Sequence, residues 1–260
     1  MKTVVAALAL ALVSSPTDAT NQNIQRQLIL GGTLVPAKSK TYMVGLRHSA
    51  DGESFCGGSL VSPIHVLTAS QCTADNIRWA SIGTRHLNGT VDGEQIKVVS
   101  VLNHPNYSVN AAYSDDFALL ELETASSFTP VKLAAADDSD FKAGATATAL
   151  GWGLTNEGGS MSKELRRVDL PLISDKECKQ MSDIDDTMMC AGGLISEDVC
   201  DGDYGGPLVI ESRGKDVLLG VVSWSKDNAC GRGPYYPGMY SRVSRARSWI
   251  DPIISSSCFD

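Results

Sequence analysis

The sequence lacks an apolar run long enough to span a membrane, and it lacks an excess of positive charge. No stretch reaches the roughly 18 consecutive apolar residues that a transmembrane helix needs. Lysine and arginine number 22 against 30 aspartate and glutamate residues, which gives a formal net charge of −8. Surfaces that bind nucleic acid concentrate positive charge. The two absences therefore argue against a membrane protein and against a nucleic-acid-binding protein.

Signatures of metal-binding and repeat proteins are missing too. No two cysteines have the C-x-x-C spacing, so neither a zinc ribbon nor a thiol redox motif is supported. No period of roughly 30–45 residues is visible, which argues against a helical repeat protein. The chain has 260 residues, of which 43% are apolar and 20% charged. This is typical of one large globular domain or two small ones, and no cofactor is expected.

The first 19 residues have the pattern of a secretory signal peptide. Lys2 supplies a positive charge, Val4–Val13 is an apolar run of ten residues, and small and polar residues follow as far as Ala19. A run of this length is too short to cross a bilayer. We therefore expect residues 1–19 to be removed and the mature chain to be extracellular, with residues 20–28 as a short pro-like segment.

Secretion makes disulfides the expected state of the seven cysteines. Six of them can pair in many ways, and spacing alone does not choose among the pairings. Because the number is odd, one cysteine is left over, and Cys258, two residues from the end, is the natural candidate. We expect it either to remain a free thiol or to join two chains in a disulfide-linked dimer. The others are Cys56, Cys72, Cys178, Cys190, Cys200 and Cys230.

Two N-x-S/T sequons stand in the mature region, at Asn88 and at Asn106. In a secreted chain these are candidate glycosylation sites on surface loops, although such short matches also arise by chance. Asn88 is expected in a turn and is the better candidate of the two.

Most of the chain has the pattern of short β-strands separated by glycine, proline, asparagine and aspartate. Strands of this length and spacing favour a β-sandwich or barrel. The predicted strands span 42–46, 58–61, 65–68, 96–101, 117–122, 145–150, 207–210, 217–222 and 238–243. Only residues 243–254 have a helical period, and Pro252 is expected to shorten that helix. The composition of residues 134–140 indicates a linker between two halves.

Several blocks of sequence resemble one known family, in the order that the family has them. The blocks are Ile29-Leu30-Gly31-Gly32, Cys56-Gly57-Gly58-Ser59-Leu60, Leu67-Thr68-Ala69-Ser70-Gln71-Cys72, Asp115-Asp116-Phe117-Ala118-Leu119-Leu120 and Cys200-Asp201-Gly202-Asp203-Tyr204-Gly205-Gly206-Pro207-Leu208. Gly151-Trp152-Gly153 and Val222-Ser223-Trp224 fit as well. With these motifs the chain resembles the trypsin-like serine proteases from about Ile29 to Ile254.

The resemblance implies an all-β fold of two antiparallel six-stranded β-barrels, with a cleft between them and a C-terminal α-helix. The implied trypsin-like domain spans 29–260, with the first barrel at 29–136, the second at 137–244 and the helix at 245–256. The resemblance also implies the disulfides Cys56–Cys72, Cys178–Cys190 and Cys200–Cys230.

The catalytic residues of that family are not all present. The family uses a serine nucleophile, a histidine base and an aspartate that orients the base. The resemblance places Gln71 at the base position, Asp116 at the aspartate position and Tyr204 at the nucleophile position. A glutamine amide cannot take a proton as imidazole does, and a phenol with a pKa near ~10 is mostly neutral. None of the four histidines, at 48, 65, 86 and 104, falls at a position the family uses for catalysis.

Gln71 keeps one function of the missing histidine. Its amide can still donate a hydrogen bond to Asp116, with a donor–acceptor distance within ~3.2 Å. We therefore expect the aspartate to remain satisfied while the proton relay is lost.

Activation and substrate binding also depart from the family pattern. Relatives become active when a cut after a basic residue frees an amine like that of Ile29, which then pairs with the acid at Asp203. Here Leu28 precedes Ile29, so we predict that this ion pair does not form by a trypsin-type cut.

Asp198 matches the acid that binds basic side chains, and two interpretations stay open: a retained pocket for Lys or Arg, or a relic that is solvated or faces Tyr204. Ser225 replaces the glycine expected at the substrate-binding edge.

The acids Glu197, Asp198, Asp201 and Asp203 lie close in sequence. The family motifs explain two of them, so no metal site is predicted from this cluster.

Among secreted homologues with a broken triad, the chain resembles the glucanase inhibitor proteins of oomycete plant pathogens. This resemblance implies a catalytically inactive protein, secreted into the host apoplast, that binds and inhibits a host plant endo-β-1,3-glucanase and so suppresses defence. Two other functions stay open: an active secreted serine-type endopeptidase that uses Tyr204, and a pseudo-protease that acts as a scaffold or in signalling.

Overall fold

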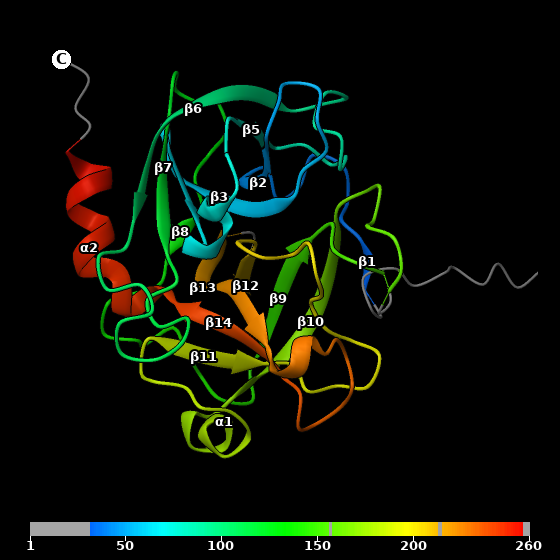
Figure 1. Cartoon of the computed structure of the whole chain (residues 1–260), viewed down its shortest axis with the longest axis vertical. Coiled ribbons are helices and arrows are strands. Elements are labelled where there is room, and N and C mark those ends of the chain that lie inside the picture. Colours follow the sequence, from blue (N-terminus) through cyan, green and yellow to red (C-terminus); the bar gives the residue numbers. More distant parts are fainter. Residues whose placement is uncertain (1–31, 156–157, 213–214, 257–260) are drawn as a thin grey trace, which may run out of the picture.

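A computed structural model describes residues 32–155, 158–212 and 215–256 (Figure 1). These residues form two six-stranded antiparallel β-barrels, and a helix follows at the C-terminal end. The predicted fold class is therefore confirmed. In Figure 1 the first barrel lies above the second, and helix α2 lies at the left beside both.

The first barrel closes through six antiparallel strands in the order β2-β3-β4-β7-β6-β5. Its core is built from alternate apolar residues of these strands, including Met43, Leu46, Leu60, Leu67 and Ile82, which are fully buried. The strands are β2 (Met43–Arg47), β3 (Cys56–Ser62), β4 (His65–Thr68), β5 (Trp79–Ile82), β6 (Glu94–Asn103) and β7 (Ala118–Leu122).

The second barrel closes in the order β10-β11-β14-β13-β12-β9, with β9 pairing back onto β10. Its strands are β9 (Thr146–Gly151), β10 (Arg166–Ile173), β11 (Met188–Ala191), β12 (Pro207–Ser212), β13 (Lys215–Ser225) and β14 (Gly238–Arg242). Two short strands from the first half of the chain join its sheet. β1 (Thr33–Leu34) pairs with β10, and β8 (Lys132–Leu133) runs parallel to β13.

The two barrels touch backbone to backbone next to the predicted site. A Cβ atom added at Gly57 of β3 would lie 2.7 Å from the Cα of Gly206, which precedes β12. Nearby, Trp152 is almost fully buried and donates from Nε1 to the carbonyl of Arg85, on the first half of the chain, at 3.1 Å. The seam is therefore close-packed, and it holds loops of both barrels in fixed relative positions.

Two short helices flank the barrels, and the sequence patterns missed one of them. Helix α1 (Asp175–Met181) begins after Ser174, whose hydroxyl accepts a hydrogen bond from the Glu177 amide at 3.3 Å. Helix α2 spans Val243–Ser255, so it begins where the helical period of the sequence begins, two residues before the start that the family resemblance implies. None of the helices in the described part of the chain combines the length and apolar character that a membrane span needs.

The expectation that Pro252 shortens the C-terminal helix is wrong, because α2 continues through it. A proline removes its own amide donor from a helix, and its ring crowds the carbonyl four residues earlier, but it leaves the amides of the residues that follow it. At this position, near the helix end, the following residues keep their bonds, and the Ser256 amide donates to the Pro252 carbonyl at 3.2 Å.

The segment 134–140 connects the barrels, as its composition predicted, and it is fastened to the second one. The Ala134 amide donates to the Leu218 carbonyl at 3.0 Å, and Asp138 forms an ion pair with Arg242 at 2.6 Å. These bonds make the connection part of the folded domain and not a free linker.

Candidate functional site

The residue at the base position, Gln71, lies on a short 3₁₀ helix (Ser70–Ala74) that follows β4. A disulfide between Cys56 and Cys72 ties this helix to β3. Gln71 directly precedes Cys72, so this covalent link fixes its position. Its side chain lies at the seam between the barrels, where it reaches Ser223 of the second barrel.

The aspartate position, Asp116, is completely buried and fully hydrogen-bonded. Its Oδ1 accepts the backbone amide of Gln71 at 2.9 Å. Its Oδ2 accepts the Gln71 side-chain amide at 2.8 Å and the hydroxyl of Ser223, on β13, at 2.6 Å. Burial raises the pKa of this carboxyl above its usual value, and the hydrogen bonds oppose that effect.

The predicted hydrogen bond between the Gln71 amide and Asp116 is confirmed by the 2.8 Å distance. The same Nε2 also donates to the carbonyl of Ser223. Both N–H groups of this amide are thus directed at buried acceptors. The glutamine satisfies the aspartate as a donor and leaves no basic nitrogen for a nucleophile.

Ser223 is a site residue whose role the sequence patterns did not reveal. It lies in the Val222–Trp224 block, which was identified only as a family motif. Its hydroxyl holds Asp116 and its carbonyl holds Gln71, so it connects both positions to the second barrel.

The nucleophile position, Tyr204, lies on a tight turn before β12. Gly205 has a φ of +77°, and a Cβ there would lie 2.2 Å from Thr68 Oγ1. Only glycine meets both conditions without strain. The turn is fixed further by the Gly57 amide, which donates to the Tyr204 carbonyl at 2.7 Å.

The Tyr204 side chain is half-buried, and its hydroxyl donates to Asp201 Oδ1 at 2.6 Å. Burial, followed by the hydrogen bond and the negative charge of Asp201, raises the pKa of this phenol well above its usual range. The tyrosine therefore stays protonated and is directed toward a carboxylate of its own loop. The phenolate that nucleophilic attack requires is disfavoured by both effects.

Asp203 is also buried, and its carboxylate is held by the backbone. Oδ1 accepts the Gly153 amide at 2.7 Å and Oδ2 accepts the Cys200 amide at 3.0 Å. Burial raises the pKa of this carboxyl to about 6. The prediction that Asp203 forms no ion pair with the Ile29 amine stays a prediction, because Ile29 lies outside the described residues.

Asp198 is closed to solvent, with an exposed fraction of 0%. Its Oδ1 accepts the Val199 amide at 2.8 Å, whereas Oδ2 has no well-oriented partner among the described residues. Burial raises the pKa of this carboxyl to about 8. The solvated form of the relic interpretation is therefore wrong, because the group lies in the interior.

Two aromatic side chains stack at the end of β13, close to Ser223. Tyr113 stacks on Trp224 with ring centroids 5.9 Å apart and planes 24° from parallel. Ser225 follows Trp224 at the end of β13 and pairs with Gly238. The tyrosine ring thus occupies space on the face of Trp224, a feature that the sequence patterns did not predict.

The histidines are held by contacts of their own. His65 is buried and lies 2.7 Å from the hydroxyl of Ser62. His104 lies 3.8 Å from Asp115 and packs edge-on against Trp249 of α2. Within the described residues, no hydrogen bond joins a histidine to Gln71 or Tyr204.

The remaining predicted sites are placed as follows. The three disulfides of the structure are Cys56–Cys72, Cys178–Cys190 and Cys200–Cys230, which is the pairing that the resemblance implies. Asn106 is exposed, whereas Asn88 is only partly so and accepts the Thr90 hydroxyl at 2.8 Å. Cys258 and the signal segment 1–19 lie outside the described residues. Among the residues that are described, no group of three or more His, Cys, Asp or Glu side chains is placed to hold a metal.

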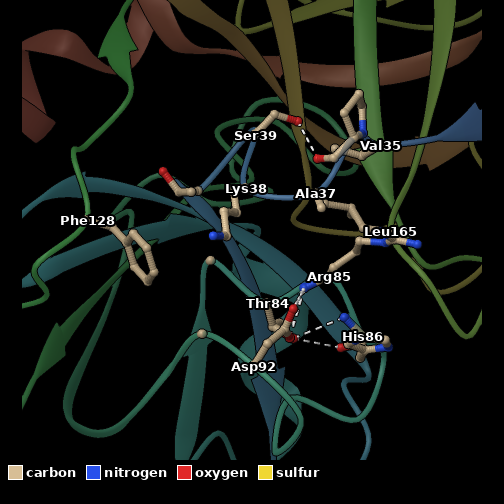
Figure 2. A pocket seen from close by; sticks show the side chains of 14 residues that line it. Val35, Ala37, Lys38, Ser39, Thr84, Arg85, His86, Asp92, Phe128 and Leu165 are labelled. Carbon is tan, nitrogen blue, oxygen red and sulfur yellow. Dashed lines mark hydrogen bonds between the residues drawn. The ribbon is translucent and has the colours of Figure 1, made fainter.

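A separate hollow of about 540 Å³ lies away from the triad positions (Figure 2). Figure 2 shows Phe128 on one side of it and Val35 and Leu165 on the other. At its base, Asp92 accepts the Thr84 hydroxyl at 2.6 Å and the Arg85 amide at 3.1 Å. The Asp92 carboxylate is thus engaged by groups of its own neighbourhood.

Comparison with known proteins agrees with this architecture. The family described as Trypsin matches residues 29–250. Glucanase inhibitor protein 3 of Phytophthora infestans is 47% identical over 260 residues, which cover 97% of this chain and 98% of that relative. Glucanase inhibitor protein 2 of the same species is 49% identical over 233 residues, or 88% of this chain and 90% of that relative. A trypsin of Saccharopolyspora erythraea is 37% identical over 223 residues, covering 83% and 93%.

Proposed function

Since the chain belongs to the trypsin family and its triad positions hold Gln71 and Tyr204, we propose that it is a secreted, catalytically inactive homologue that binds and inhibits a plant endo-β-1,3-glucanase. The identity of the target rests on the close relatives, which are glucanase inhibitor proteins. In this function the protein suppresses a host defence and works in the host apoplast.

The observation that carries the inactive assignment is the geometry of Gln71 and Tyr204. The Gln71 side-chain amide donates to Asp116 and to the carbonyl of Ser223, and the Tyr204 hydroxyl donates to Asp201. A nucleophile and a base must lie within hydrogen-bonding reach of each other to begin acyl transfer. In a protease with a complete triad, losing either group lowers the rate about 10⁶-fold. Loss of both leaves no efficient route to peptide hydrolysis.

A protein of this kind inhibits by covering part of its target with its own surface and does not need a catalytic reaction. Stable protein complexes bury about 1,200–2,000 Å², an area that the loops around the cleft can offer. The formal charge of −8 would speed the encounter with a basic partner. We expect the affinity for the glucanase to fall with added salt, because long-range attraction is screened.

The test is a titration of purified plant endo-β-1,3-glucanase with the mature chain, followed by release of reducing ends from a soluble β-1,3-glucan. Inhibition that saturates at a fixed ratio of the two proteins, and reverses on dilution, is the expected result. An unchanged rate of glucan hydrolysis at excess chain would contradict the proposed target.

Two controls separate the other functions. An active endopeptidase would cleave the glucanase, so intact mass is measured before and after incubation, and it should not change. A scaffold that is dimerised through Cys258 would migrate at twice its mass on a non-reducing gel, whereas the inhibitor is expected to migrate as a monomer.

Three further assignments belong to this proposal. Residues 1–19 direct secretion and are removed, and Asn88 and Asn106 accept glycans, with Asn106 the more accessible side chain. Asp198 is a relic of a specificity pocket: its side chain is closed to solvent, and burial raises the pKa of its carboxyl to about 8, which favours the neutral form.

A further inference from the structure

Two hollows lie beside the parallel pair of β8 and β13, and one of them is also lined by residues 39–42 and 129–131 of the first half of the chain. Their volumes are about 580 Å³ and about 550 Å³. Both are lined by Lys132 of β8 and by Lys215, the first residue of β13. Because they share these two side chains, the hollows adjoin and form one continuous depression, which we call the lysine trough.

Three lysines give the trough its charge. Lys142 lines one hollow together with Lys132 and Lys215. All three are exposed, and none forms an ion pair with another described residue. This concentration of unpaired positive charge contrasts with a chain whose formal charge is −8.

The acids that line the trough are already engaged. Asp216 forms an ion pair with Lys40 at 2.6 Å and accepts the Tyr42 hydroxyl at 2.5 Å. Asp140 accepts the backbone amide of Ala135 at 2.8 Å. Lys40 therefore neutralises Asp216, whereas Asp140 is held by a neutral amide and keeps its charge. Three lysines without an ion pair outnumber this one carboxylate among the lining residues of their hollow.

The rest of the lining is aliphatic and hydroxylated. Ile210, Val217 and Ala145 line the hollow that Lys142 enters, and Thr129 and Ser139 supply hydroxyl groups along the trough. Aliphatic side chains pack against the C–H faces of sugar rings, and hydroxyls can donate to or accept from sugar hydroxyls. This mixture of lining groups suits a carbohydrate better than a bare inorganic anion, which needs only charge.

We propose that the lysine trough binds a linear oligosaccharide that carries carboxylates on successive sugars, an oligouronate. Two adjoining hollows give room for a chain of sugars. All three lysines line the first hollow and two of them also line the second, so carboxylates of more than one sugar can each meet an ammonium group. A single small anion would meet only part of this charge. Such binding would anchor the protein to an acidic polysaccharide through a face that is separate from Gln71 and Tyr204.

The test uses the mature chain and a fluorescent oligogalacturonate of about ten sugars, with binding followed by anisotropy at low salt. The variant Lys132→Gln/Lys142→Gln/Lys215→Gln should bind about tenfold more weakly or worse, since exposed ion pairs are individually weak and act together. Binding by the unmodified chain should also weaken as salt is added.

A matched control changes the same net charge elsewhere. Lys97→Gln/Lys176→Gln/Lys179→Gln removes three exposed lysines from β6 and α1, and its affinity should stay within about twofold of the unmodified chain. Thermal unfolding shows whether each triple variant is folded. If a triple variant does not fold, its three single-substitution variants are measured in its place.

The anisotropy measurements test whether the lysine trough binds the oligogalacturonate. Selective loss in the trough variant, with no competition from a neutral β-glucan oligosaccharide, supports it. No binding by the unmodified chain, equal loss in both triple variants, or equal competition by inorganic phosphate at matched charge would each overturn it. Because the assay contains no glucanase, its failure would leave the proposed inhibitory function untouched.

Discussion

At the scale of single residues, Gln71 separates two tasks that one histidine performs in an active triad. Histidine both donates to the buried aspartate and takes a proton from the nucleophile. The glutamine amide performs the first task, at 2.8 Å from Asp116, and cannot perform the second. The donor that supports the buried carboxylate is therefore kept under the proposed loss of catalysis.

This interpretation predicts the effect of Gln71→Leu. The variant leaves Asp116 with one donor fewer inside the protein, and an unsatisfied buried group costs about 1–3 kcal/mol. The free energy of unfolding, measured by urea denaturation, should fall by that amount. Gln71→His restores a donor and should remain close to the unmodified chain. Equal stability of the leucine variant and the unmodified chain would show that the amide does not support Asp116.

The sequence predicted these contacts only in part. The bond from Gln71 to Asp116 follows from residue types and motif positions. The bond from Tyr204 to Asp201, and the stack of Tyr113 on Trp224, depend on side-chain directions that are set by the fold. No periodic pattern in the sequence encodes such directions.

At the scale of elements, strand length did not decide which strands the sequence predicted. The four-residue β4 was predicted with its observed bounds, and the cores of the longer β6 and β13 were predicted too, whereas β5, β10 and β11 were missed. β1 and β8 have two residues each and exist because neighbouring strands pair with them. Pro171 lies within β10, where a proline is unexpected, and this obscured the strand.

Helix α1 was missed although its start signal was present. Ser174 and Glu177 have the spacing of a capping box, and their side chains lie 2.5 Å apart. Only seven residues follow, too few for a helical period to stand out.

The cap leads to a prediction for Ser174→Ala. The variant loses the acceptor for the first-turn amide of Glu177, which should lower the free energy of unfolding by about 1 kcal/mol. Thermal or urea denaturation measures the change. Lys176→Ala, at an exposed position of the same helix, serves as control and should be nearly neutral. A cap variant as stable as this control would argue against the role of Ser174.

At the scale of the whole molecule, buried acids link stability to pH. Asp198 has a usual pKa of 3.8 that burial raises to about 8, and burial raises that of Asp203 to about 6. Between about pH 4 and about pH 8, Asp198 holds a proton in the folded chain that it has released in the unfolded chain. Stability from Asp198 is therefore greatest below about pH 4 and is lost as the pH rises toward about 8.

Asp198→Asn tests this linkage. The amide resembles the protonated carboxyl and does not titrate, so the fall in free energy of unfolding between about pH 5 and about pH 8 should be smaller in the variant. Urea denaturation across this range measures both slopes. Identical slopes for the variant and the unmodified chain would mean that Asp198 does not contribute.

The central claim is that a protease fold here carries no protease chemistry, and the most direct measurement is peptide turnover. Purified mature chain is incubated with a mixture of fluorogenic peptides, with and without an organophosphorus reagent. The account predicts no turnover above the blank and no covalent adduct by mass spectrometry. Repeated turnover that the reagent abolishes would contradict it.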